Sequence, residues 1–184
     1  FPWHMIVRSC LRKSAWPCSV IDSFSRANYY LGEFGNGMKM KVLANMLVAI
    51  HNVSSAEMMV LGMKAGLDPE LIYTVMNNSS GRSRMLEVRG ARMVKDDYDN
   101  PSMKVKVFQK DLKIIESFAA SLNCPTPLFA STKQVYLSAL AMGLGDKDTA
   151  SVCAVLSEWA QLKRKQSSAC RKTDPPGIPH RDGS

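Results

Sequence analysis

The sequence lacks the cysteine patterns that hold small metal-binding and disulfide-stapled domains together. Its 184 residues contain five cysteines, an odd number, and no two of them form a CxxC pair beside a histidine cluster. We therefore predict neither a zinc site nor a disulfide framework, and the cysteines favour a reducing compartment. The expected location is the cytoplasm. A mitochondrial location is the alternative, because the first twenty residues contain basic but no acidic side chains.

A long uninterrupted apolar run is also missing. A membrane-spanning helix needs roughly 18 such residues. The longest apolar region, residues 38–61, is interrupted by the polar side chains Lys41, Asn45, His51, Asn52 and Glu57. Hydrophobic residues make up 46% of the chain and charged residues 22%, as in packed globular proteins. We predict one globular domain that does not cross a membrane.

Positive charge is present, but it is concentrated at the two ends of the chain. The formal net charge is +8, and the excess of Lys and Arg lies in residues 1–28 and 160–184. A nucleic-acid-binding face would instead concentrate basic residues on folded elements, with aromatic residues between them. We therefore expect no specific nucleic-acid partner. Salt-sensitive binding by the charged ends is the weaker alternative.

The body of the chain shows the apolar periodicity of helices and no alternation typical of strands. We expect helices over about residues 37–65, 69–76, 83–95, 103–121 and 128–142, and a last one capped by Asp146 that reaches about Leu162. Residues 1–28 show no sustained period and are predicted to form an irregular leader, and residues 163–184 a flexible basic tail. The predicted fold class is all-α, a bundle of about six helices over residues 29–162 around one long N-terminal helix.

The sharpest local feature is a glycine-rich segment, residues 32–37, that directly precedes the long helix. It reads GxxGxG, whereas the dinucleotide fingerprint reads GxGxxG and follows a strand, so the segment does not indicate a Rossmann fold. Glycines at this place let a ligand approach the N-terminus of a helix, which favours anions.

Polar residues form a narrow stripe on the helix that follows. At about 100° per residue, Lys41, Asn45 and Asn52 fall within about 40° of one another, with Ser55 beside them. A lysine in apolar surroundings has its ammonium form disfavoured, which suits proton transfer. Asn45, one turn on, can hold a hydroxyl or carboxylate. The alternative is an ordinary solvated stripe, because Lys and Asn are mostly exposed in proteins.

The same segment resembles the GxGxxxKxxxN motif of the β-hydroxyacid dehydrogenases, the family of 3-hydroxyisobutyrate dehydrogenase. Gly35, Gly37, Lys41 and Asn45 stand at the fixed positions of that motif. The resemblance continues in order through residues 55–57, 64–67, 80–83, 110–112, 125–128 and 143–148, and covers about residues 29–160. It implies the all-helical domain that follows the Rossmann domain in this family, with a fold like the C-terminal domain of 6-phosphogluconate dehydrogenase.

The resemblance also implies a function and the residues that carry it. The function is that of an NAD(P)-dependent oxidoreductase for a small 3-hydroxy acid or its semialdehyde, and family members associate through this domain, which implies a homo-oligomer. Lys41 would be the general acid/base, Asn45 and Gly37 would bind the substrate, and Lys110 would contact NAD or NADP. Ser80, Gly81 and Ser83 would line the cleft, with a plain turn as the alternative.

The leader departs from the family pattern. Residues 1–28 resemble nothing in the family and contain no phosphate-binding glycine loop. We therefore expect the helical domain without its Rossmann domain, a truncated gene product that is inactive alone. The alternative is a catalytically silent helical module that associates with itself or with a full-length homologue, because the helix over 37–65 is apolar nearly all round.

Overall fold

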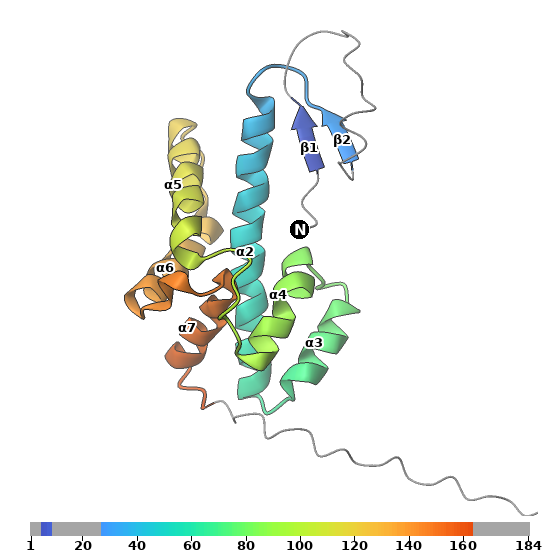
Figure 1. Ribbon diagram of the computed structural model, residues 1–184, viewed down its shortest axis with the longest axis vertical. Helices are drawn as coiled ribbons and strands as arrows, with labels where there is room; N and C mark the ends of the chain where they lie inside the picture. The colour runs from blue at the N-terminus through green and yellow to red at the C-terminus, as the bar shows by residue number, and fades with distance from the viewer. Residues whose placement is uncertain (1–4, 9–26, 164–184) are drawn as a thin grey trace, which may run out of the picture.

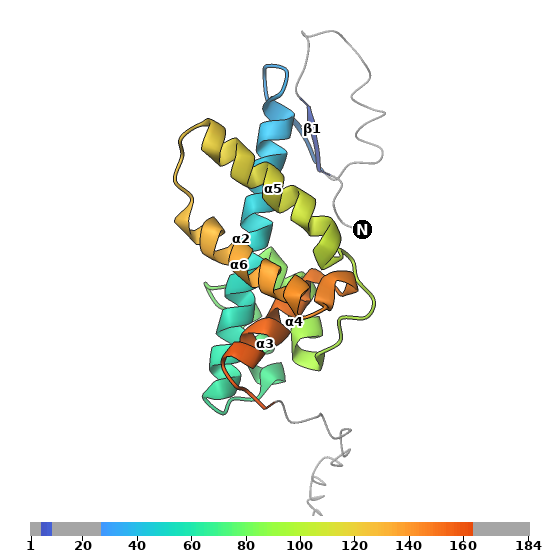
Figure 2. The same cartoon turned by 90° about the vertical axis from the view of Figure 1, so that its left-hand side faces the viewer.

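One long helix forms the axis of the molecule, and five shorter helices surround it (Figures 1 and 2). The computed structural model describes residues 5–8 and 27–163. Its helices are α2 (Asn36–Lys64), α3 (Pro69–Asn77), α4 (Arg84–Lys95), α5 (Val105–Ser121), α6 (Pro127–Ala141) and α7 (Val152–Trp159), with the 3-10 turns η1 (Leu144–Asp146) and η2 (Thr149–Ser151) before α7. The predicted all-α fold of about six helices is confirmed.

The long helix α2 is enclosed over its lower half only. In Figure 1, α3, α4 and α7 surround the lower half, and α5 runs beside the upper half. Of the buried residues of α2, only Val42 precedes Ala49. From the sequence we expected no segment apolar enough to cross a membrane, but α2 is long and apolar enough to do so by length and composition alone. Core helices of other proteins pass the same test, and the lower half of α2 forms the centre of the bundle.

A glycine ends α2 and an aspartate begins α3. Gly66 adopts a left-handed conformation (φ 88°) just after α2. Its N–H donates to the carbonyl of Met63 at 3.0 Å, and the N–H of Leu67 donates to that of Gly62 at 3.1 Å. These two bonds are a Schellman motif, which glycine permits without strain. Asp68 then caps α3 by accepting a backbone N–H at 3.0 Å.

The helix α3 packs closely against α2 and α4 because a glycine faces it on each. A Cβ at Gly62 would lie 2.6 Å from Ile72, and one at Gly90 would lie 2.5 Å from the ring of Tyr73. The hydroxyl of Tyr73 donates to the carbonyl of Glu87 at 3.0 Å, which holds the ring in place. The two glycines therefore set the distance between these three helices.

Two short strands precede α2 and were not expected from the sequence. β1 (Met5–Arg8) and β2 (Ala27–Tyr30) pair in parallel, with Met5 opposite Ala27. The prediction of an irregular leader is wrong at these positions, because four residues are too few to show a sustained alternation. The remainder of that leader and residues 164–184 of the predicted tail lie outside the described residues.

The segment before α7 also differs from the prediction. Asp146 does not cap a helix but is exposed and pairs with Lys106 at 2.7 Å and Lys104 at 2.9 Å. Hydrogen bonds from these two ammonium groups lower the pKa of Asp146 to about 2. The cap is Asp148, whose carboxylate accepts the N–H of Ala150 at 2.9 Å at the start of η2.

Candidate functional site

The upper turns of α2 carry three of the predicted site residues. Gly35 caps the helix in a left-handed conformation (φ 92°), and Gly37 follows in the first turn. The side chain of Lys41 is exposed and that of Asn45 is half-buried. The expectation of an apolar setting for Lys41 is wrong for the described part of the chain, because the core includes Val42 on this turn but leaves the side chain of Lys41 exposed.

Lower on the same face, the polar side chains belong to the core. Asn52 is 1% exposed. Its side-chain amide donates to the hydroxyl of Tyr136 at 2.9 Å and to the carbonyl of Thr149 at 2.8 Å. Ser55 is also buried and donates to the carbonyl of His51 at 2.6 Å. The stripe is therefore neither a continuous site nor a solvated surface: its upper part is open and its lower part is structural.

The turn before α4 has one structural member. Ser83 accepts the N–H of Leu86 at 3.1 Å and so caps α4, and its hydroxyl lies 3.5 Å from that of Ser55. Ser80 and Gly81 are exposed. The plain-turn alternative therefore fits Ser83, whereas Ser80 and Gly81 remain available to a ligand.

The fourth predicted residue, Lys110, is exposed on α5, which packs along α2 (Figure 2). Neither Lys41 nor Lys110 forms an ion pair or a side-chain hydrogen bond with another described residue. Several other lysines do: Lys39, Lys64, Lys104, Lys106, Lys133 and Lys147. Two adjacent helices thus present ammonium groups that the fold does not use. An exposed ammonium suits a carboxylate or phosphate.

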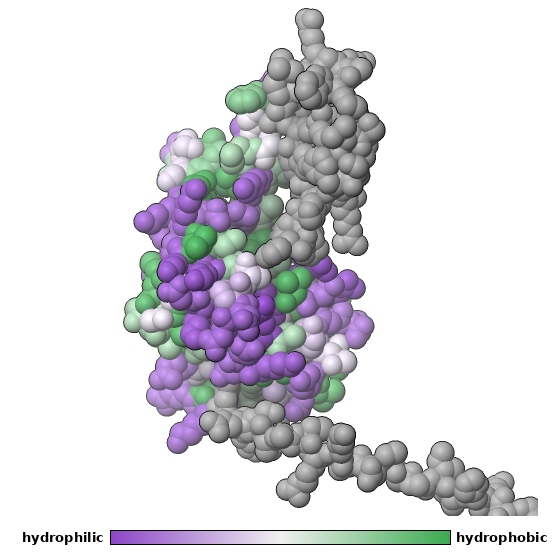
Figure 3. Space-filling view, in the orientation of Figure 1, coloured by the Kyte–Doolittle hydropathy of each residue, from purple (hydrophilic) through white to green (hydrophobic). Residues whose placement is uncertain are grey.

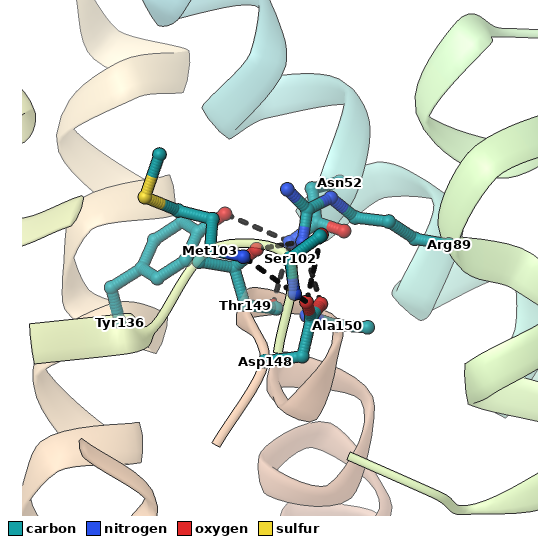
Figure 4. Close-up of polar contacts among 8 residues, drawn as sticks. All are labelled: Asn52, Arg89, Ser102, Met103, Tyr136, Asp148, Thr149 and Ala150. Carbon is teal, nitrogen blue, oxygen red and sulfur yellow. Dashed lines mark hydrogen bonds and ion pairs between the residues drawn. The ribbon is translucent and has the colours of Figure 1, made fainter. Parts of the chain in front are cut away.

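A buried ion pair at the centre of the molecule escaped the sequence analysis. Arg89 of α4 and Asp148, which are 7% and 0% exposed, lie 2.6 Å apart (Figure 4). Arg89 also hydrogen-bonds the hydroxyl of Thr149. The backbone N–H and hydroxyl of Ser102 donate to the other carboxylate oxygen at 2.7 and 3.0 Å. This polar knot (Asn52, Arg89, Ser102, Tyr136, Asp148 and Thr149) joins α2, α4, α6 and the segments before α5 and α7.

The electrostatics of the polar knot fix its charge state. Burial raises the pKa of Asp148, but the Arg89 guanidinium and the hydrogen bonds from Ala150 and Ser102 outweigh burial, so the pKa lies below its usual value. Burial raises the pKa of Tyr136 to about 12. Both groups therefore keep one protonation state near neutral pH, which suits a scaffold rather than a proton-transfer site.

A signal for the polar knot was present in the sequence. Arg89 lies four residues after Met85 and four before Met93, in the middle of the apolar face of α4. A lone arginine on an apolar helical face needs a buried partner. Nothing local identifies that partner, because Asp148 lies 59 residues further along the chain.

Two hollows in the described part of the chain lie apart from the predicted site residues. One hollow of about 240 Å³ is lined by residues around Tyr98 and Lys147, and another of about 330 Å³ by residues around Leu61 and Trp159. Neither includes a predicted site residue. Over residues 5–8 and 27–163, no group of three or more His, Cys, Asp or Glu side chains could hold a metal ion. The predicted site residues lie on α2 and α5, where Lys41 and Lys110 are exposed and Gly37 and Asn45 are half-buried.

Comparison with known proteins gives consistent relatives. The matching family model is described as the NAD-binding region of NADP-dependent 3-hydroxyisobutyrate dehydrogenase and covers residues 35–156. L-threonate dehydrogenase from Cupriavidus necator is 35% identical over 137 residues, which are 74% of this chain and 46% of that protein. Glyoxylate/succinic semialdehyde reductase 2, chloroplastic, from Arabidopsis thaliana is 32% identical over 136 residues, 74% of this chain and 38% of that protein.

A solved structure agrees with these sequence matches. The crystal structure of 3-hydroxyisobutyrate dehydrogenase from Salmonella typhimurium matches with a TM-score of 0.71 and 30% identity, over 74% of this chain and 48% of that chain. The chain spans less than half the length of these three relatives. The family match extends over residues 35–156, more than half of the chain, and it shows that the protein belongs to the β-hydroxyacid dehydrogenase family, the family of 3-hydroxyisobutyrate dehydrogenase.

Proposed function

We propose that this chain provides the helical, substrate-binding part of an NAD(P)-dependent dehydrogenase for small 3-hydroxy acids or their semialdehydes. One observation carries the proposal. Lys41 and Asn45 stand at the lysine and asparagine positions of the family motif and are open, whereas Asn52 on the same face is used by the core. The names of the relatives, which refer to threonate, glyoxylate and succinic semialdehyde, support a small carboxylate as substrate.

The proposal gives each of these residues a task, which follows from its position in the family motif and from its place on the upper half of α2. In the oxidation direction, Nζ of Lys41 would accept the hydroxyl proton of the substrate in its unprotonated amine form and become an ammonium group as the carbonyl forms. Asn45, one turn on, orients the substrate through a hydrogen bond to its hydroxyl or carboxylate. Gly37 keeps the first turn free of a side chain, so a carboxylate can approach the helix N-terminus. NAD or NADP, when bound, would supply the hydride-transfer chemistry at the substrate carbon.

The residues of this chain fit one contact to the cofactor. Lys110 is exposed on α5 and unpaired among the described residues, so its ammonium can approach a phosphate. The segment over residues 32–37 does not have the glycine order that holds a pyrophosphate. We therefore assign Lys110 a contact to the cofactor and not the whole cofactor site.

Cofactor binding is tested by calorimetric titration of the full chain with NADH and NADPH. Lys110→Ala is expected to weaken binding about tenfold, the effect of losing one charge-assisted hydrogen bond. The matched control is Lys113→Ala, another exposed and unpaired lysine on α5, which should bind like the wild type. Equal effects of the two substitutions, or no binding at millimolar cofactor, would contradict the assignment of Lys110.

Proton transfer is tested by oxidation of a series of 3-hydroxy acids, followed by the absorbance of the reduced cofactor. Lys41→Ala should lower kcat by about a hundredfold or more, because general acid–base catalysis contributes at least that much. Lys39→Ala is the matched control, since Lys39 is exposed on the same turn and bonds only to Asn36 at 3.2 Å. Unchanged turnover in Lys41→Ala would overturn the role of Lys41.

A second candidate function is a catalytically silent helical interaction module. The observation that favours it is an exposed apolar surface on α2, at Met40, Leu43 and Leu47. It predicts self-association of a chain that binds neither NADH nor NADPH, which light scattering and the same titrations would show together. Turnover that depends on Lys41 would exclude it.

A further inference from the structure

The larger of the two hollows lies where the C-terminal ends of α2 and α7 pack side by side, at the lower end of the bundle in Figure 1. We name it the Trp159 hollow; its volume is about 330 Å³, and its apolar lining consists of Val60, Leu61, Leu156 and Trp159. Leu61 and Trp159 are 72% and 56% exposed. The hollow differs from the face shown in Figure 3, where hydrophilic side chains dominate the middle of the body. Exposed apolar side chains around a hollow indicate a binding surface.

The lining of the Trp159 hollow indicates the chemistry of its occupant. Its volume is near the lower limit of ligand pockets, roughly 300–1,000 Å³, so it can hold a few side chains. Exposed aromatic side chains bind proline-rich segments in the polyproline II conformation. Glu57, which also lines the hollow, and Glu158, next to Trp159, are exposed, and neither forms an ion pair with another described residue. The occupant that fits is therefore a proline-containing segment with an apolar side chain and a positive charge.

The sequence of this chain contains such a segment at residues 175–181. Pro176 and Pro179 stand at the two ends of a PxxP pattern, Ile178 lies between them, and Arg181 follows. Ile178 is the only large apolar side chain in residues 164–184, which contain five Lys and Arg side chains but only two Asp. Because proline fixes φ, a segment of this composition loses little conformational entropy when it docks in an extended form.

The chain leaves α7 at the edge of the hollow. Lys64 of α2 donates to the carbonyl of Ala160, another lining residue, at 2.7 Å. Gln161 is left-handed (φ 49°), and the N–H of Leu162 donates to the carbonyl of Ser157 at 2.9 Å, which is the longer hydrogen bond of a Schellman motif. Leu162 is half-buried and packs against the core. The start of the C-terminal segment is therefore held within two residues of the hollow.

The length of chain beyond Leu162 allows a return to the hollow. Ile178 lies 16 positions further on, a distance of at most about 50 Å when extended and roughly 20 Å on average for a flexible chain. A short flexible connection gives the segment an effective concentration in the millimolar range at the hollow. A contact too weak to hold a separate peptide can therefore hold this one.

We propose that residues 175–181 dock in the Trp159 hollow of their own chain, with Ile178 beside Trp159 and Arg181 near Glu57. The contact covers Leu61 and Trp159, the two most exposed apolar side chains of the lining. The inference does not depend on the proposed dehydrogenase activity, because none of the lining residues is a predicted site residue.

The fluorescence of Trp159 tests whether the hollow is covered. In a full-length parent chain with Trp3→Phe and Trp16→Phe, Trp159 is the only tryptophan. Adding Ile178→Glu should shift its emission to longer wavelength and increase its quenching by acrylamide, because a carboxylate does not enter an apolar hollow. Ala169→Glu adds the same charge to the same segment and should behave like the parent. Circular dichroism checks that the chains are folded. Equal emission and quenching in all three chains, or equal effects of the two substitutions, would overturn the proposal.

Titration with a synthetic peptide of residues 173–183 tests the hollow as the place of docking. Bound to the Ile178→Glu chain, the peptide should restore the emission of the parent. The parent should bind it about tenfold more weakly, because its own segment competes at a millimolar effective concentration. Leu61→Glu, at an exposed position, should abolish peptide binding when added to the Ile178→Glu chain. Equal affinity of parent and Ile178→Glu, or binding that survives Leu61→Glu, would contradict the assignment.

Dilution of the parent chain tests whether the segment docks in its own chain. Docking within one chain predicts an emission maximum that is independent of protein concentration. A shift to longer wavelength on dilution would show that the segment of a second copy occupies the hollow, and would overturn the proposed arrangement.

Discussion

The two halves of α2 place asparagine side chains in different surroundings. Asn45 and Asn52 lie on one face of the helix, two turns apart. Asn52 is buried and donates two hydrogen bonds to other elements, whereas Asn45 is half-buried and forms no such bond with a described residue. The difference shows that periodicity sets the direction of a side chain, but the neighbouring elements decide whether it serves stability or remains available to a ligand.

The lower half of α2 supports the upper half. The polar knot attaches this part of α2 to α4, α6 and the segment before α7, and the apolar core surrounds it. A helix held so firmly at one end extends as a rigid element at the other, because its backbone hydrogen bonds continue unbroken from Asn36 to Lys64. Sites on rigid helices keep their geometry better than sites on loops.

The largest expected effect comes from breaking the ion pair of the polar knot. Arg89→Met leaves the carboxylate of Asp148 buried without its counter-ion, which should lower the free energy of unfolding by about 3–5 kcal/mol. Urea unfolding followed by circular dichroism measures the change. Arg92→Met, three residues further along α4, is the control and should stay within about 0.5 kcal/mol of the wild type. Similar losses in both variants would show that the ion pair has no special role.

A smaller effect should separate the two asparagines. Asn52→Ala leaves the carbonyl of Thr149 and the hydroxyl of Tyr136 without their donor, at a cost of about 1–3 kcal/mol of unfolding free energy. Asn45→Ala should cost no more than about 0.5 kcal/mol. The same urea titration compares the pair. Equal costs would mean that the upper half of α2 is as tightly integrated as the lower half.

The contribution of Asp148 to the free energy of unfolding should be visible in the acidic part of the pH–stability profile. Its pKa is lowered in the folded protein, so its contribution is complete above the unfolded value of about 3.9 and is lost as the pH falls through the folded value. We expect a flat urea midpoint above about pH 5 and a decline below about pH 4. In Asp148→Asn the protein should be less stable at neutral pH and the decline shallower. Asp97→Asn is the control, because Asp97 is exposed and forms no ion pair with another described residue. An unchanged decline in Asp148→Asn would contradict the assignment.

The helices of this fold were predictable because their signals are local. Gly66, Asp68 and Ser83 mark helix ends through hydrogen bonds to residues within a few positions, and the predicted helix ranges lie next to them. Local sequence did not show which of the two aspartates, Asp146 or Asp148, caps the segment before α7. It depends on Arg89, whose guanidinium meets Asp148 only after the chain has folded.

The candidate site was predictable in part for a similar reason. The motif predicts Lys41 and Asn45 as site residues from their spacing, but spacing alone could not show which positions of the stripe the neighbouring elements cover, such as Asn52. The apolar setting expected for Lys41 failed for that reason. β1 and β2 were missed because pairing between distant four-residue segments leaves little pattern in either segment.

The smallest expected effect on stability is that of the residue with the largest proposed role in catalysis. Lys41→Met removes an exposed ammonium group that has no described partner, so the free energy of unfolding should stay within about 0.5 kcal/mol of the wild type. A residue that can be replaced without loss of stability, at a position where the family motif has lysine, is retained for what it binds. A destabilisation as large as that of Asn52→Ala would instead place Lys41 in the scaffold, and the distinction between the two halves of α2 would fail at its most important position.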